Sequence, residues 1–217
     1  MCKLERYFKA LQEAAENKDQ AQFVFPNEDE GHNAVSMGVI FGNATNTVKM
    51  YCGKFGLFTD EFENAVNEKY GDSEFKPMDK LFKNVEDFLE RKGTTFEAVI
   101  ANKPQGLTSD EEIKITINGA VIAKEPQGLT SKYKDLFTKH KDKVKISVLK
   151  SEDESENKIR NKINKLTPHF AVGNNMFRFE TDEIRRTAIV SFNYKEEVKL
   201  FLERFDQLKT DSLPLSL

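Results

Sequence analysis

The stretch from His169 to Glu180 constrains the fold more than any other part of the chain, because it combines strand periodicity with a chemically reactive side chain. Its apolar residues recur at alternate positions on two short arms and are Phe170, Val172, Phe177 and Phe179. Between the arms, Gly173–Asn175 supplies residues that tolerate the positive φ angles of a tight turn. The stretch therefore predicts a β-hairpin in which His169, Arg178 and Glu180 share the face opposite the apolar residues. On that face we expect Glu180 to pair with His169 or Arg178.

Other segments carry the patterns of strands and helices. Period-two alternation and β-branched residues predict strands at Thr47–Cys52, Thr95–Ala101, Asp142–Leu149 and Ala188–Phe192, with a second hairpin of Ile113–Ile117 and Ala120–Ala123 around Asn118-Gly119. Helical spacing of apolar residues predicts helices over residues 4–17, 60–70, 77–92, 131–140, 158–166 and 195–208. The small-residue segment 34–44 fits a buried helix or a strand, and we expect a helix because it stands between a loop and a strand. Residues 29–33 are typical of a loop.

The order of these elements indicates the fold class. Helices between the first three strands favour parallel neighbours, while the hairpins add antiparallel pairs. The predicted fold is α/β, a three-layer sandwich with a mixed, mostly parallel sheet flanked by helices. We expect a helix and loop over residues 1–30, a single domain over 31–210 and a frayed tail over 211–217.

Composition excludes several classes of protein. No apolar stretch approaches the roughly 20 residues that a membrane helix needs, and Met1–Arg6 alternates charges without the apolar core of a signal peptide. Two cysteines, Cys2 and Cys52, are too few for a disulfide framework, and no Cys/His cluster has the spacing of a zinc site. We therefore expect a cytoplasmic protein with no membrane association, no metal and no cofactor.

The net charge of −3 conceals a basic segment. Residues 132–165 carry eleven Lys/Arg against six Asp/Glu. If the protein contacts nucleic acid, this segment is where positive charge could meet phosphates. The candidate nucleic-acid-binding residues are Lys132, Lys139, Lys141, Lys143, Lys145 and Arg160. The alternative interpretation is a solvated helix and strand face.

A six-residue repeat, Pro-Gln-Gly-Leu-Thr-Ser, occurs at 104–109 and again at 126–131. Each copy follows a predicted strand, and Thr-Ser before a charged run is typical of a helix N-cap, so the copies predict two similar turns. An anion cradle is the alternative, although neither copy contains the Gly-Lys-Ser/Thr of a phosphate loop.

With a late histidine hairpin followed by a closing strand and helix, the order of elements over residues 34–208 resembles the phospholipase D-like superfamily. The signature of that superfamily is His-x-Lys-x-x-x-x-Asp followed by Gly-Ser-x-Asn. The resemblance implies that the histidine attacks a phosphodiester while the lysine and asparagine hold its oxygens. His169 matches the histidine, but Ala171 stands at the lysine position and Met176 at the aspartate position.

The second half of the signature permits two alignments. In one, Ser191 and Asn193 match Ser-x-Asn, although Val190 replaces the glycine and the separation from His169 is seven residues too long. In the other, Ala188–Phe192 is the family's final strand, 195–208 is its closing helix, and no Ser-x-Asn motif remains. Either way the phosphate-holding lysine is missing, and Arg178 is a candidate to replace it from the neighbouring arm.

The resemblance leads to two functional hypotheses. The first is a non-catalytic phospholipase D-like module that recognises a protein partner or a nucleic-acid backbone, in a bacterial restriction or defence system. The alternative is a metal-independent phosphodiesterase or nuclease that acts as a homodimer through His169. The candidate catalytic residues are His169, Arg178, Glu180, Ser191 and Asn193. Loss of the lysine and the aspartate argues against an enzyme, and a plain structural subunit is a third class.

Overall fold

A single mixed sheet of eight strands organises the computed structural model. The structure describes residues 1–17, 21–53, 55–101, 116–117, 120–121, 129–150, 164, 166–182 and 187–215. In spatial order the strands are β1 (Phe23–Asn27), β9 (Thr187–Phe192), β8 (Met176–Asp182), β7 (Phe170–Gly173), β2 (Thr47–Cys52), β3 (Thr95–Ile100), β6 (Val144–Leu149) and β10 (Ser212–Leu215). A separate antiparallel pair, β4 (Thr116–Ile117) and β5 (Ala120–Val121), agrees with the predicted second hairpin.

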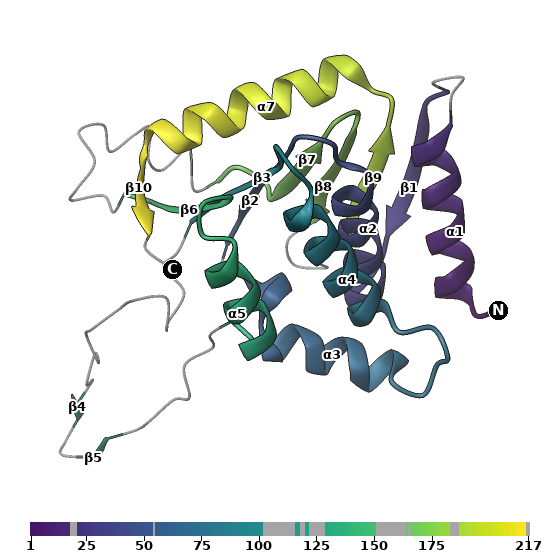
Figure 1. Ribbon diagram of the computed structural model, residues 1–217, viewed down its shortest axis with the longest axis horizontal. Helices are drawn as coiled ribbons and strands as arrows, with labels where there is room; N and C mark the ends of the chain where they lie inside the picture. Colours follow the sequence, from purple (N-terminus) through teal and green to yellow (C-terminus); the bar gives the residue numbers. More distant parts are fainter. Residues whose placement is uncertain are drawn as a thin grey trace.

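Helices cover both faces of the sheet (Figure 1). They are α1 (Lys3–Glu16), α2 (Glu30–Asn43), the short 3-10 turn η1 (Gly56–Phe58), α3 (Asp60–Tyr70), α4 (Pro77–Glu90), α5 (Ser131–Lys139) and α7 (Lys195–Thr210). Helices α2 and α4 pack on one face, and α7 lies across the other (Figure 1). The predicted α/β class and its three layers are therefore confirmed.

The strand directions differ in part from the prediction. Only the pairs β2/β3 and β3/β6 are parallel, whereas the other five neighbouring pairs are antiparallel. The sheet is mixed as expected, but the prediction that it is mostly parallel is wrong. The reason is that β7, β8 and β9 follow one another as a meander of short connections, which can join only antiparallel strands.

Aromatic side chains form the centre of the core on the α2 and α4 face. Phe96 on β3 is fully buried and packs with four other phenylalanines at ring-centroid distances of 5.2 to 6.1 Å, namely Phe41, Phe55, Phe58 and Phe137. On the opposite face, Phe201 of α7 contacts three rings of the hairpin, namely Phe170, Phe177 and Phe179. The predicted apolar face of the hairpin thus packs against α7.

Both ends of the chain contribute edge strands that the sequence analysis did not predict. Strand β1 pairs with β9, and β10 pairs with β6, both antiparallel. Ser212–Leu215 is therefore a strand where a frayed tail was expected. Helix α2 begins at Glu30, so the loop predicted at residues 29–33 is also corrected. The boundary predicted after residue 30 falls within α2, directly after its first residue.

Three predictions lie outside the described residues. They are the turn at Asn118-Gly119, most of the repeated segments at 104–109 and 126–131, and all but two residues of the helix at 158–166.

Candidate functional site

His169 lies at the start of β7, where the hairpin meets the carboxyl end of β2. Its Nδ1 is 2.6 Å from Oε2 of Glu180, and its backbone carbonyl accepts a hydrogen bond of 2.9 Å from the Glu180 amide. The predicted pairing of Glu180 is therefore confirmed with His169. A β-carbon at Gly53 would lie 3.1 Å from Cε1 and 3.2 Å from Nε2, so the missing side chain makes room for the imidazole ring. A carboxylate on one ring nitrogen fixes the ring orientation, as in sites where the other nitrogen reacts.

Arg178 lies on the same face of the sheet, two residues from Glu180 on β8 and directly opposite Ala171 on β7. Its side chain is 8% exposed. Burial lowers the pKa of the guanidinium to about 10, while the neighbouring Glu180 carboxylate favours the charged form. The side chain therefore carries a positive charge at neutral pH. Among the described residues, none forms an ion pair with this guanidinium within salt-bridge distance.

The amide of Asn27, at the end of β1, holds Arg178 in place. With the amide oxygen turned toward Arg178, it accepts hydrogen bonds of 2.9 Å from Nε and 3.1 Å from the Ser36 hydroxyl. The amide nitrogen then donates to the backbone carbonyl of Asp29 at 3.2 Å. Among the described residues, these contacts involve only Nε of Arg178, which leaves the terminal nitrogens Nη1 and Nη2 to bind an anion.

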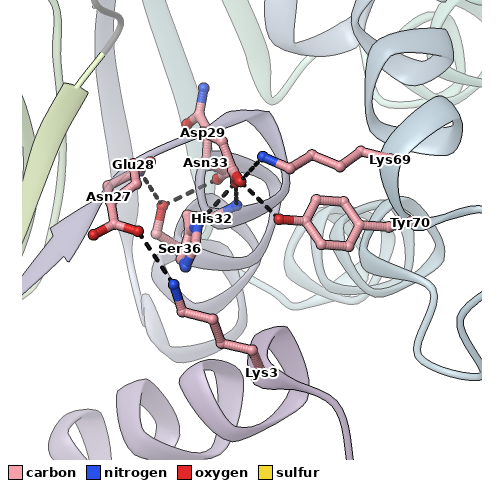
Figure 2. A network of polar contacts seen from close by, with 9 residues as sticks. All are labelled: Lys3, Asn27, Glu28, Asp29, His32, Asn33, Ser36, Lys69 and Tyr70. Atoms are coloured by element: carbon pink, nitrogen blue, oxygen red, sulfur yellow. Dashed lines mark hydrogen bonds and ion pairs between the residues drawn. The ribbon is translucent and has the colours of Figure 1, made fainter.

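Asp29 forms the centre of a polar network next to this arginine support (Figure 2). Its carboxylate caps α2 by accepting 2.9 Å from the His32 amide, and it also accepts 2.8 Å from the His32 ring and 2.7 Å from the Tyr70 hydroxyl. Lys69 forms an ion pair with the same carboxylate. Although burial favours the neutral acid, these hydrogen bonds lower the pKa of Asp29 well below its usual range.

Ala171 and Met176, the two residues that depart from the phospholipase D signature, are buried in the hydrophobic core. Ala171 is 2% exposed and, like Met176, packs within the apolar cluster beneath α2. Gly173 continues this close packing, since a β-carbon there would lie 3.2 Å from Cγ2 of Ile40. A lysine at position 171 would have to displace part of this packing, and Arg178 is the cation nearest to that position across the strand pair.

Ser191 and Asn193 do not join His169. Ser191 is cross-strand from Phe177, so its side chain points to the α7 face, opposite His169 and Arg178. Asn193 has a positive φ of 64° at the end of β9. Its side chain donates 2.8 Å to the carbonyl of Ala21 and accepts from Asn175, which ties the turn together. Ser191 therefore lies on the α7 face of the sheet and Asn193 lies in a turn, and neither is on the face that carries His169.

The predicted lysine surface is largely occupied by internal partners. Lys132, Lys139 and Lys145 lie 2.6, 3.4 and 3.8 Å from the carboxylates of Glu63, Glu90 and Glu97. Lys143 donates to the carbonyls of Leu89 and Arg91 and so caps the end of α4. Lys141 is exposed, and Arg160 lies outside the described residues. Nucleic-acid binding by this surface stays a prediction.

Replacing Lys139, Lys141 and Lys145 together by glutamine should have little effect on the affinity for duplex DNA, because two of these charges are already balanced by carboxylates. If the surface does bind phosphates, log K should fall with log salt at a slope of about −0.9 for each one neutralised. Fluorescence anisotropy at several salt concentrations measures this slope. The control replaces Lys3 and Lys9 on α1 by glutamine. A loss of affinity confined to the first variant, together with a smaller slope, would assign nucleic-acid contacts to these lysines.

Sequence reasoning missed Asn27 and Asp29, which support Arg178. Both signals were present in the sequence. The alternation Phe23-Val24-Phe25 precedes Asn27, and Asp29 stands before a helix as a good N-cap residue. What the sequence could not show is that β1 pairs with β9, which brings Asn27 to a residue 151 positions later in the chain.

Similarity to known proteins extends to the fold of this chain. No family model and no curated protein sequence matches the chain. Among solved structures, the chain is similar to Nuc, a phospholipase D family member from Salmonella typhimurium, with a TM-score of 0.51 and 9% identity over 91% of this chain and 100% of Nuc. The chain has the phospholipase D fold. The predicted resemblance is thereby confirmed at the level of the fold.

Two further solved structures were also matched. TrmBL2, an archaeal chromatin protein, has a TM-score of 0.47 and 13% identity over 96% of this chain and 63% of TrmBL2. NucT from Helicobacter pylori has a TM-score of 0.43 and 8% identity over 89% of this chain and 98% of NucT.

No described helix is both long enough and apolar enough to cross a bilayer. Within the described residues, no three histidine, cysteine or carboxylate side chains come together in a group that could hold a metal ion.

Proposed function

We propose that this phospholipase D-fold protein binds a phosphodiester anion, such as a nucleic-acid backbone, without hydrolysing it. The observation that carries the proposal is the position of Arg178, a charged residue that is only 8% exposed and lies on the same sheet face as His169. A buried cation without a carboxylate partner gains free energy when it meets an anion. A guanidinium can also grip two phosphate oxygens at once, which fits a phosphodiester.

The absence of turnover follows from the residues across from this arginine. Phosphoryl transfer depends mainly on positioning and on neutralising charge at the transferring oxygens. Ala171 contributes a methyl group where the resemblance implies a lysine, and Arg178 is held at Nε by Asn27 rather than free to follow the reaction. Binding is therefore retained while the stabilisation specific to the transition state is reduced.

A second candidate, a metal-independent phosphodiesterase, is favoured by one observation. The 2.6 Å contact between His169 and Glu180 is the arrangement that prepares an imidazole to act as a nucleophile or base. Hydrolysis of bis-p-nitrophenyl phosphate or single-stranded DNA that is lost in His169→Ala would establish this activity and overturn the non-catalytic proposal.

Calorimetric titration with dimethyl phosphate and with a short single-stranded oligonucleotide tests binding. Arg178→Met keeps most of the side-chain volume and removes the charge, so it should weaken binding by about 10- to 100-fold, the value of one or two charged hydrogen bonds. Arg178→Lys should retain part of the affinity. Arg6→Met on α1 is a matched control, since Arg6 is exposed. Equal affinities of the wild type and Arg178→Met would show that the anion does not bind here.

A further inference from the structure

The hydroxyl group of Tyr7 on α1 is buried, yet no described residue forms a hydrogen bond with it. The oxygen atom is shielded from solvent although the residue as a whole is only half-buried. Leaving a buried hydroxyl without a partner costs free energy, so a group of this kind in a folded protein calls for an explanation, such as a role in binding. The Tyr7 hydroxyl therefore has a hydrogen atom that it can donate to a ligand.

The side chain of Arg178 reaches toward the part of the fold where Tyr7 lies. Arg178, Val190 and Phe25 stand opposite one another on β8, β9 and β1, so they share one face of the sheet. Nε of Arg178 donates to the amide of Asn27 at 2.9 Å, and Asn27 follows Phe25 by two residues. The arginine side chain thus extends over β9 toward β1. The Tyr7 ring packs beside the same strand, with its centroid 6.3 Å from that of Phe25.

The two side chains also act on each other electrostatically. Burial raises the pKa of the Tyr7 hydroxyl, and the positive charge of Arg178 lowers it only in part. Burial lowers the pKa of Arg178, while Glu180 and Tyr7 raise it. Tyr7 is therefore a neutral donor at neutral pH, next to a guanidinium that carries a positive charge.

Two carboxylates near Tyr7 have cations of their own. Asp29 and Glu28 both raise the pKa of Tyr7, so their charges are felt at its hydroxyl. Asp29 forms an ion pair with Lys69, and Glu28 lies 3.4 Å from Nζ of Lys3 (Figure 2). These ion pairs offset part of the negative charge that would otherwise repel an anion.

We propose that the Tyr7 hydroxyl donates a hydrogen bond to the same anion that Arg178 binds, so that α1 and β8 hold one phosphate group between them. Nη1 and Nη2 of Arg178 and the hydroxyl of Tyr7 form a set of donors that suits the non-bridging oxygens of a phosphodiester. The His32 ring supports Tyr7, since the two ring centroids are 4.5 Å apart and the ring planes are nearly perpendicular. This inference rests on the proposed function and adds to it a residue from α1.

Calorimetric titration of dimethyl phosphate into the full chain tests this role of Tyr7. Tyr7→Phe removes only the hydroxyl and should weaken binding about tenfold, the value of one hydrogen bond to a charged group. Tyr133→Phe is the matched control. The Tyr133 hydroxyl is also buried without a partner among the described residues, but it lies on α5 beside the rings of Phe58 and Phe82. Its removal should leave the affinity unchanged.

Denaturant unfolding of the free protein separates binding from folding. Tyr7→Phe should leave the unfolding midpoint unchanged, because the hydroxyl bonds no described residue in the free protein. A midpoint that falls together with the affinity would assign the hydroxyl to the fold and overturn the inference.

The titration also distinguishes this inference from the proposed function. If the wild type does not bind dimethyl phosphate, the proposed function fails and the role of Tyr7 fails with it. If binding is weakened by Arg178→Met while the wild type and Tyr7→Phe bind equally well, the proposed function stands and only the role of Tyr7 is overturned. Equal weakening by Tyr7→Phe and Tyr133→Phe would likewise overturn it.

Discussion

Phe96→Ala should lower the free energy of unfolding by about 4 kcal/mol, the upper part of the range for removing a buried aromatic side chain. Phe96, the second residue of β3, is fully buried, and four phenylalanine rings surround it on the α2 and α4 face. These rings come from α2, the η1 segment and α5, so the cavity cannot close by movement of a single side chain. Denaturant unfolding with an unchanged m-value measures the loss.

Phe23→Ala provides the matched control for this substitution. Phe23 is only half-buried on the edge strand β1, so its removal should cost about 1 kcal/mol. A loss of less than about 2 kcal/mol for Phe96→Ala, or equal losses for the two variants, would contradict the packing described for the α2 and α4 face.

Asp29→Ala should lower the free energy of unfolding by about 3 kcal/mol, through loss of the α2 cap and of charged hydrogen bonds. Asp29→Asn keeps a capping oxygen but removes the charge, so it should cost about half as much. Asp60→Ala is the control, because Asp60 is exposed in the first turn of α3 and the N-cap there is Thr59. Its removal should cost less than about 1 kcal/mol.

The contribution of Asp29 should also depend on pH. Its pKa is lower in the folded protein than in the unfolded chain, so the stabilisation is complete above the unfolded value of about 3.9. It is lost as the pH falls below that value toward the folded pKa. The difference in stability between the wild type and Asp29→Asn should therefore be constant near neutral pH and shrink below about pH 4. If the difference in stability between the two proteins grows on acidification, the ionised Asp29 carboxylate does not stabilise this network.

Local periodicity predicted the hairpin correctly because alternation in a strand fixes which side chains share a face. It placed Phe170 and Phe179 toward one layer and His169 and Glu180 toward the other, as the structure has them. It also predicted most helices to within a few residues. The same reasoning missed β1 and β10, which contain Pro26 and Pro214, because proline in a short run argues against a strand unless the strand lies at an edge.

The contacts that hold Arg178 in place could not be predicted, because they depend on pairing between strands that are far apart in the sequence. Alternation shows that Arg178 and His169 share a face, but it does not show that Arg178 is buried or that Asn27 holds it. Those facts follow from β1 adding to the edge of β9 and from α2 packing over the sheet. Likewise the lysine-rich segment was visible in the sequence, whereas its pairing with carboxylates on α3, α4 and β3 was not.

We propose above that the guanidinium of Arg178 binds a phosphodiester anion. The most direct measurement follows the Arg178 Nε–H resonance by NMR while dimethyl phosphate is added. We expect this resonance to shift and saturate together with the heat of binding, while the Nε–H resonance of Arg91, which donates to the Asp87 carbonyl, stays in place. A saturable binding curve with no movement of the Arg178 resonance, or equal movement of both arginines, would contradict the account.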